Sequence, residues 1–231
     1  MTVALVPLVA RAAPALQTVL VQGLDGDLYT RSGCISPFVE ALSKMIPRSA
    51  FSGLYYAHGL RDYAGGRGTD VNVAAASLRT ILQERAGPTV LIGHCLGALI
   101  CTEALLGISK NVHVCAILID ALSDHPASDT SDWARGLLDV LGLDVAALRN
   151  HGKRWRALVS PRPPDWLEVH AVLSTPQSWV TPFVPANGVL TAHQHPMPLD
   201  HQALVATNPG QPALVPQKIA QILRSEAQVS C

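Results

Sequence analysis

The sequence is poor in charge, in aromatic residues and in long apolar runs. Lys, Arg, Asp and Glu make up only 15% of its 231 residues, and Phe, Trp and Tyr only 5%. Lys and Arg together number 17, and so do Asp and Glu, so neither sign of charge dominates. This balance argues against nucleic acid or an anionic membrane surface as the main partner. No apolar run is long enough to span a bilayer, so we expect no membrane partner.

The cysteines show no sign of a disulfide framework. The five of them, at positions 34, 95, 101, 115 and 231, include no C-x-x-C pair, and an odd number leaves at least one unpaired. Reduced thiols in the cytoplasm are the simplest interpretation. The apolar stretch Met1–Ala15 lacks the basic start of a secretory signal, and Arg11 interrupts it. We therefore expect a cytoplasmic protein without a signal peptide.

Apolar runs alternate along the chain with segments of helical periodicity. The alternation predicts an α/β protein with a mostly parallel central sheet and helices on both faces. Its length fits one domain, residues 1–231. The expected strands are Val3–Val9, Thr18–Val21, Phe51–Tyr56, Thr89–Ile92, Val112–Ile119, Leu167–Leu173 and Gly188–His193, with Pro7 placing the first at an edge. The expected helices are Ile35–Met45, Val71–Arg85 with Thr69 as N-cap, Ala98–Leu106, Trp133–Leu141, Val145–Leu148 and Val215–Leu223.

Two segments interrupt this rhythm. His58–Gly68 is rich in glycine and is expected to be a loop. Residues 122–165 form a connection longer than usual, which predicts a helical lid over the site. The lid ends in a basic run, from His151 through Lys153 and Arg154 to Arg156. Such a run is most often a solvated face, and otherwise it would meet an acidic carrier or a pantetheine phosphate.

The sequence Gly93-His94-Cys95-Leu96-Gly97 joins an expected strand to an expected helix. Gly-x-Cys-x-Gly in that context resembles the nucleophile elbow of α/β-hydrolases, with cysteine in place of the usual serine. A sharp strand-to-helix turn strains the nucleophile's dihedral angles and requires small neighbours. Because the turn lies at a helix N-terminus, its partial positive charge would favour a thiolate or an oxyanion. The alternative is a small buried cysteine without a chemical role.

Asp120 directly follows the apolar run that ends at Ile119. Active-site groups gather at the carboxyl ends of parallel strands, so a carboxylate there is a candidate acid, although a surface cap is the alternative. Histidines follow at His193, His195 and His201. The pair His193 and His195 could suggest a metal, but no neighbouring cysteine or acidic set in the sequence completes a tetrahedral site, so none is predicted.

The loop after the second expected strand, Gln22-Gly23-Leu24-Asp25-Gly26-Asp27, feeds a helix. In an α/β-hydrolase such a loop supplies half of the oxyanion hole. The backbone N–H groups of Leu24 and Leu96 are therefore the candidates for that hole, and an ordinary turn is the alternative.

The order Cys95, Asp120, His201 is the α/β-hydrolase order of nucleophile, acid and histidine. The acid comes only 25 residues after the nucleophile (95 to 120), at the end of the very next strand. With Leu5-Val6-Pro7-Leu8, Val19–Gly26 and Asp200-His201-Gln202-Ala203-Leu204, this spacing resembles the type I thioesterase domains of non-ribosomal peptide and polyketide synthetases. The chain departs from that family in its cysteine and in lacking the His-Pro-Ala-Gly-Gly of the oxyanion loop.

The resemblance implies a chain-releasing thioesterase with a Cys-His-Asp triad and no cofactor of its own. Its partner would be a phosphopantetheinyl peptidyl or acyl carrier protein. No Asp-Ser-Leu attachment motif occurs in this sequence, so we expect the carrier upstream in a longer parent chain or on another protein. Cys95 would take the acyl or peptidyl chain and release it by cyclisation, into a strained ring such as a β-lactam, or by hydrolysis. Two alternatives stay open: a cysteine hydrolase of small esters or lactones, similar to dienelactone hydrolases, and a non-catalytic interaction domain.

Overall fold

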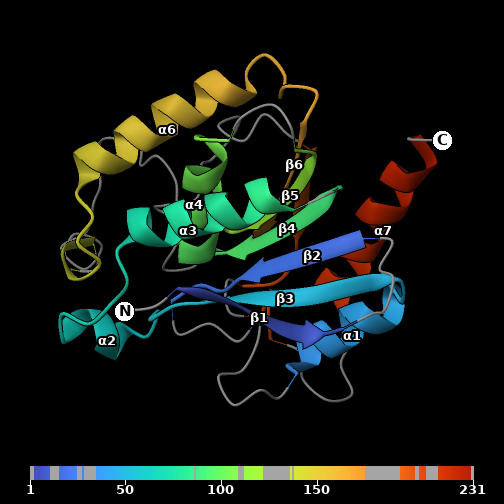
Figure 1. Cartoon of the computed structure of the whole chain (residues 1–231), viewed down its shortest axis with the longest axis horizontal. Coiled ribbons are helices and arrows are strands. Elements are labelled where there is room, and N and C mark those ends of the chain that lie inside the picture. The colour runs from blue at the N-terminus through green and yellow to red at the C-terminus, as the bar shows by residue number, and fades with distance from the viewer. Residues whose placement is uncertain are drawn as a thin grey trace.

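The molecule is built on a seven-stranded sheet with the order β1-β3-β2-β4-β5-β6-β7 (Figure 1). The computed structural model describes residues 3–10, 16–24, 28, 35–85, 87–108, 112–121, 136, 138–174, 193–200, 203–206 and 213–229. The strands are β1 (Ala4–Val9), β2 (Leu16–Val21), β3 (Ser49–Tyr55), β4 (Thr89–His94), β5 (Val114–Ile119), β6 (Leu167–Ser174) and β7 (His193–Met197). β1 is antiparallel to β3 and every other pairing is parallel, which confirms the expected mostly parallel sheet.

Helices cover both faces of this sheet, as the alternation predicted. They are α1 (Pro37–Met45), α2 (Leu60–Ala64), α3 (Val71–Glu84), α4 (Leu96–Leu105), α6 (Val145–Val159) and α7 (Leu214–Val229). Figure 1 shows α3, α4 and α6 on one side of the sheet and α1 and α7 on the other. Two hydrophobic clusters correspond to these two layers. One unites buried residues of α3, α4 and α6, and the other those of α1 and α7.

The direction in which successive strands are added to the sheet reverses at β2. From β2 the chain runs to β3 on one side, and then returns to β4 on the other side of β2. Such a reversal opens a crevice at the carboxyl ends of the two central strands, where open α/β sheets bind ligands. The loop after β2 and the turn after β4 both lie at this point.

Edge and cap positions follow from local chemistry. β1 is the edge strand that Pro7 predicted, and its register slips between Pro7 and Val9. The cap of α3 differs from our prediction. Asp70 is the N-cap, because its side chain accepts hydrogen bonds from Asn72 N at 2.7 Å and Val73 N at 3.2 Å. Thr69 instead accepts a hydrogen bond from Ala57 N through its hydroxyl.

Three further expectations were wrong in extent. The glycine-rich segment 58–68 contains the short helix α2. The expected helix Val145–Leu148 continues to Val159, so the basic run lies within α6 and not after a helix. The last strand is His193–Met197, so it begins where we expected it to end and places His195 in a strand where we expected a loop; residues 188–192 lie outside the described ranges.

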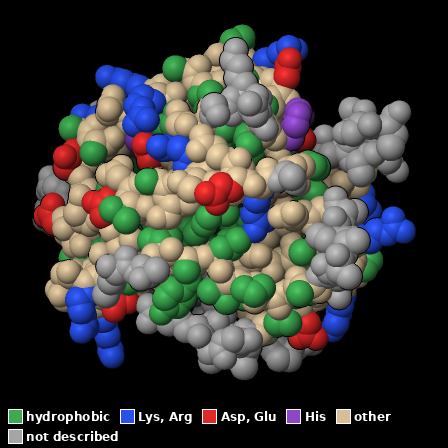
Figure 2. All heavy atoms as spheres, in the orientation of Figure 1, with side chains coloured by type: hydrophobic (Ala, Val, Ile, Leu, Met, Phe, Trp, Pro, Cys, Tyr) green, Lys and Arg blue, Asp and Glu red, His purple; other side chains and the backbone are tan. Residues whose placement is uncertain are grey.

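The surface is lean in charge, as the composition indicates. Figure 2 shows apolar side chains near the middle of the visible face, with Lys and Arg mostly at its margins. Among the helices that the structure describes, none combines the length and the apolar character needed to cross a membrane.

Candidate active site

Cys95 occupies a sharp turn between β4 and α4. Its φ of 53° and ψ of −120° lie outside the regions that non-glycine residues commonly adopt. The backbone N–H of Cys95 donates a hydrogen bond of 3.0 Å to Ile119 O, so pairing between β4 and β5 continues into the turn. The residue is 2% exposed. This strained strand-to-helix geometry is that of a nucleophile elbow.

The glycines on either side of Cys95 are required by close backbone approach. A Cβ on Gly97 would lie 2.1 Å from Val21 O, so α4 touches the end of β2 there. A Cβ on Gly93 would lie 2.7 Å from both Ala98 Cα and Cys101 Sγ. Neither position has space for a side chain, which agrees with the reason the elbow motif carries glycine.

The loop after β2 lies directly against Cys95. A Cβ on Gly23 would be 2.7 Å from Cys95 Cβ and 2.8 Å from His94 O. Leu24 follows in a half-buried turn and packs against the cluster of α3, α4 and α6. Leu96, fully buried, is the first residue of α4. The loop that contains Leu24 and the first turn of α4 that contains Leu96 are both adjacent to Cys95. The role of their N–H groups in an oxyanion hole stays a prediction.

Asp120 is fully buried at the carboxyl end of β5 and has a φ of 41°. Its Oδ1 accepts a hydrogen bond of 2.7 Å from Ser174 N at the end of β6. Its own N–H donates to Val172 O at 2.9 Å. The aspartate is therefore held by the neighbouring strand and is not the solvated cap that was the alternative. Its catalytic role is a prediction.

The expected base, His201, lies outside the described residues, and so does Asp124, the next carboxylate along the chain after Asp120. Asp200 is described and exposed. Its Oδ1 accepts a hydrogen bond of 2.8 Å from Ala203 N, and its carbonyl accepts one of 3.1 Å from Leu204 N. Asp200 thus caps the turn that follows it.

Sequence reasoning missed a group of buried polar residues that includes Gln22, the residue directly after β2. The Tyr56 hydroxyl donates to Gln22 O, and the Gln22 side-chain amide contacts His58 Nε2. The rings of Tyr56 and His58 meet edge to face with centroids 5.4 Å apart. All three residues are at most 6% exposed. Polar residues that directly follow neighbouring parallel strands were the signal, since Gln22 follows β2 and Tyr56 follows β3.

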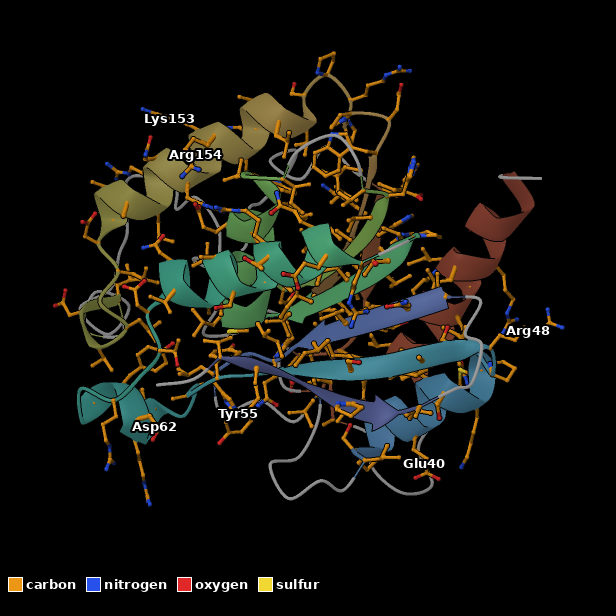
Figure 3. The ribbon with its side chains drawn as sticks, in the orientation of Figure 1. Glu40, Arg48, Tyr55, Asp62, Lys153 and Arg154 are labelled. Carbon is orange, nitrogen blue, oxygen red and sulfur yellow. The ribbon has the colours of Figure 1, made fainter. Side chains whose placement is uncertain are left out.

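The residues of the basic run on α6 have different environments: His151 and Arg154 contact Glu103 of α4, and Lys153 is exposed. His151 is buried, with Nδ1 2.7 Å from Glu103 Oε2 and Nε2 2.9 Å from Thr102 Oγ1. Arg154 pairs with the same glutamate, Nη1 to Oε1, at 3.2 Å. These two residues join α6 to α4. Buried His151 is not part of a solvated face, whereas Arg154 stays exposed beside its ion pair, and the carrier contact stays a prediction. Lys153 is exposed (Figure 3).

The lid expected at residues 122–165 stays a prediction. Residues 122–135 are outside the described part of the chain. Within it, α6 contributes Leu148, Trp155 and Val159 to the same cluster as α3 and α4.

A group of metal-ligand residue types forms only in the tertiary structure. Cys115 lies on β5, and Glu168 and His170 lie on β6. His170 Nδ1 lies 3.1 Å from His195 Nε2. The group of Cys115, Glu168 and His170 does not include His193 or His195, so the expectation that the β7 histidines hold no metal stays a prediction.

Comparison with known proteins gives a family and a fold. A family model described as "Alpha/beta hydrolase family" matches residues 19–230. No curated protein is detectably similar in sequence.

Solved structures share the architecture at low identity. A lipase-esterase related protein from Clostridium acetobutylicum is 9% identical with a TM-score of 0.61, over 96% of this chain and 98% of that one. A monoacylglycerol lipase from Paleococcus ferrophilus is 17% identical with a TM-score of 0.59, over 97% and 99%. The NocB thioesterase domain, in covalent complex with a fluorophosphonate nocardicin G analogue, is 17% identical with a TM-score of 0.53, over 96% and 98%.

Proposed function

Because the chain belongs to the alpha/beta hydrolase family, we propose that it is a chain-releasing thioesterase that uses Cys95 as its nucleophile. The observation that carries this proposal is the dihedral strain at Cys95, where a non-glycine residue is held at positive φ between β4 and α4. Such strain costs about 1–3 kcal/mol and persists where the surrounding structure requires it, commonly at active sites. An inert buried cysteine would have no need of it.

In the proposed mechanism, His201 removes the proton of the Cys95 thiol, and Asp120 orients the imidazole and stabilises its charged form. The thiolate attacks the carbonyl carbon of a thioester on a phosphopantetheinyl carrier. The N–H groups of Leu24 and Leu96 receive the oxyanion. The tetrahedral intermediate collapses with loss of the pantetheine thiolate, which takes the proton from His201. The product of this half-reaction is acyl-S-Cys95.

The second half-reaction regenerates the thiol. His201 removes a proton from water, or from a nucleophile within the bound chain, as that group attacks the acyl carbon. The Cys95 thiolate leaves and is reprotonated by the histidine, which releases an acid or a ring. Since the acyl group passes from one thioester to another, it keeps its activation until release. That retention favours weak internal nucleophiles and strained rings, such as a β-lactam.

The spacing of the candidate residues supports a thioester substrate over a free ester. Asp120 follows Cys95 at the very next strand, a spacing that resembles the thioesterase domains. The fold itself does not separate the two substrates, since a thioesterase domain, NocB, and a monoacylglycerol lipase both share it over nearly their full length.

The test is acylation followed by intact mass. The full chain is incubated with carrier proteins that bear candidate acyl or peptidyl groups, and the adduct is located by peptide mapping. We expect one acyl group on Cys95 and none on Cys95→Ala. Absence of any adduct with carrier-bound and free esters alike, together with an unreactive thiol, would indicate a non-catalytic interaction domain. Adducts from free lactones or esters alone would indicate a small-ester hydrolase.

Thiol alkylation provides an independent measure. Iodoacetamide should modify Cys95 well below about pH 8.5, the ordinary pKa of a free thiol. Cys101 is the internal control, since burial raises the pKa of its thiol and it is fully buried on α4. Equal, slow modification of both cysteines contradicts an activated nucleophile.

Replacement of sulfur by oxygen separates cyclisation from hydrolysis. Cys95→Ser fits the elbow but forms an oxygen ester that has lost part of the activation. If release needs a retained thioester, the variant should become acylated and then stall or release linear acid. A single-turnover assay follows adduct mass and product together. The same product at a similar partition would contradict the cyclisation proposal.

A further inference from the structure

A group of metal-binding side chains lies on the sheet face that α1 and α7 cover. Cys115 is the second residue of β5, and Glu168 and His170 are the second and fourth residues of β6. The register pairs Cys115 with Glu168, so both side chains point to the same face of the sheet. One ligand atom from each of the three residues can be chosen so that all lie within 4.8 Å of one another.

These positions are separate from the candidate active site. They belong to the amino-terminal halves of β5 and β6, whereas Cys95 and Asp120 follow the carboxyl ends of β4 and β5. An ion bound there would not take part in the proposed acyl transfer. The inference therefore does not depend on the proposed function.

The donor set is suited to a divalent ion of borderline softness. Thiolate, imidazole and carboxylate are the three ligand types that Zn²⁺ takes in proteins, at about 2.0–2.3 Å. In tetrahedral geometry those bond lengths separate the ligand atoms by about 3.3–3.8 Å. The three ligand atoms lie within 4.8 Å of one another, and His170 Nε2 and Glu168 Oε1, now 2.7 Å apart, would move slightly apart to admit the ion. A thiolate and a carboxylate also neutralise the two charges of the cation.

His170 already has the environment of a metal ligand. It is 3% exposed, its Nε2 lies 2.7 Å from Glu168 Oε1, and its Nδ1 lies 3.1 Å from His195 Nε2. Ligating histidines usually donate their other N–H to a fixed acceptor, which sets the tautomer. His195 Nε2 lies within reach of such a hydrogen bond from His170 Nδ1.

We propose that Cys115, Glu168 and His170 form a site for a divalent transition-metal ion of the Zn²⁺ class, with His195 holding the His170 imidazole in its ligating tautomer. The metal replaces the proton between His170 Nε2 and Glu168, and Cys115 loses its thiol proton on binding. Three protein ligands leave a fourth position for water. The bound ion joins β5 to β6 and, through His195, fixes β7.

The experiment uses Co²⁺ as a spectroscopic substitute for Zn²⁺ on the full chain, stripped of metal with a chelator. We expect one Co²⁺ per chain and a thiolate-to-cobalt charge-transfer band in the near ultraviolet. Cys115→Ser should remove the band and Glu168→Gln should weaken binding strongly. His195→Gln should lower affinity about 10- to 100-fold, the usual effect of losing the group that orients a ligating histidine. Cys95→Ser is the matched thiol control and should keep the band.

Folding is measured in parallel. Glu168→Gln preserves size at a side chain that is 31% exposed, so it should fold like the parent. Zn²⁺ should raise the Tm of the wild type and leave that of Glu168→Gln unchanged, because only the native site gains binding free energy. The proposal is overturned if the wild type binds no Co²⁺, if the band survives in Cys115→Ser, or if Cys95→Ser removes it.

Discussion

Cys95 and Asp120 share a property found in no other non-glycine residue of the described ranges, a positive φ. Both residues directly follow a parallel strand, β4 and β5 respectively, and both are buried. Aspartate adopts positive φ more readily than most non-glycine residues, whereas cysteine does not. The strain at Cys95 is thus the more informative of the two.

Asp120→Asn should leave the fold intact and lower turnover by about 10⁴-fold. Asparagine also tolerates positive φ and can still accept the hydrogen bond from Ser174 N. It has no charge with which to orient and stabilise an imidazolium. Acyl-release rates and urea unfolding should be measured on the same preparation. Near-normal turnover would exclude Asp120 as the acid and direct attention to Asp124 and Asp200.

His201→Ala should abolish acylation, with a loss of about 10⁴-fold, because the Cys95 thiol then lacks its base. His193→Ala is the matched control, since His193 is an exposed residue of β7 and should retain most activity. Burst-phase formation of acyl-enzyme measures both. A dead His193→Ala variant beside an active His201→Ala variant would assign the base to β7.

At the scale of elements, α4 depends on its contact with β2. Gly97→Ala should destabilise the fold by about 3 kcal/mol and displace the elbow, because its Cβ would lie 2.1 Å from Val21 O. Gly136→Ala is the control, since a Cβ there meets nothing within 4 Å. Chemical denaturation of the two variants gives the comparison. Equal stability would mean that the β2–α4 contact is looser than this structure has it.

The junction between α4 and α6 should depend on pH. Hydrogen bonds and charge from His151, with Arg154, outweigh burial and lower the pKa of Glu103 below its ordinary 4.5. Arg79 of α3 donates to the Glu103 carbonyl. A carboxylate with a lowered pKa contributes stability above its unfolded pKa, and that contribution is lost as the pH falls through the folded value.

Glu103→Gln should therefore lose about 2 kcal/mol at pH 7 and show a shallower loss of stability below about pH 4.5 than the wild type. Thermal unfolding between pH 3 and pH 7 measures both. Parallel stability curves for the two proteins would show that the Glu103 contacts contribute nothing that depends on its charge.

At the scale of the molecule, the formal net charge is zero, because the 17 basic residues are balanced by 17 acidic ones. A partner that is attracted by charge would therefore respond to the positive side chains of one region and not to the molecule as a whole. Figure 2 shows basic side chains at the upper left, where Figure 1 places α6. Figure 3 shows Lys153 and Arg48 at opposite ends of the molecule. An acidic carrier that docks on α6 would interact with Lys153 and not with Arg48.

Lys153→Glu should thus lower kcat/KM for carrier-bound thioesters by about fivefold, corresponding to about 1 kcal/mol for an exposed charge pair. Its kcat/KM for a small free thioester should not change. Arg48→Glu, also at an exposed position, is the control for net charge. Equal effects of both variants would show that the carrier does not dock on α6.

The sequence by itself determined the fold class and the strand-to-helix turn at Cys95, because both depend on short-range patterns. Apolar runs separated by helical periodicity led to a mostly parallel sheet, and Pro7 to its edge. The glycines around Cys95 indicated the elbow before any contact was known. Each of these features depends on neighbours within a few positions along the chain.

Tertiary structure alone decided which polar residues meet. Glu103 and His151 are 48 residues apart, and Gln22 and His58 are 36 apart. Cys115 and His170 meet only because β5 pairs with β6. The same dependence explains why His151 was expected on a solvated face, and why the group of Cys115, Glu168 and His170 was not foreseen from the sequence. Burial and strand pairing set the partners of a polar side chain, and the local sequence does not encode either.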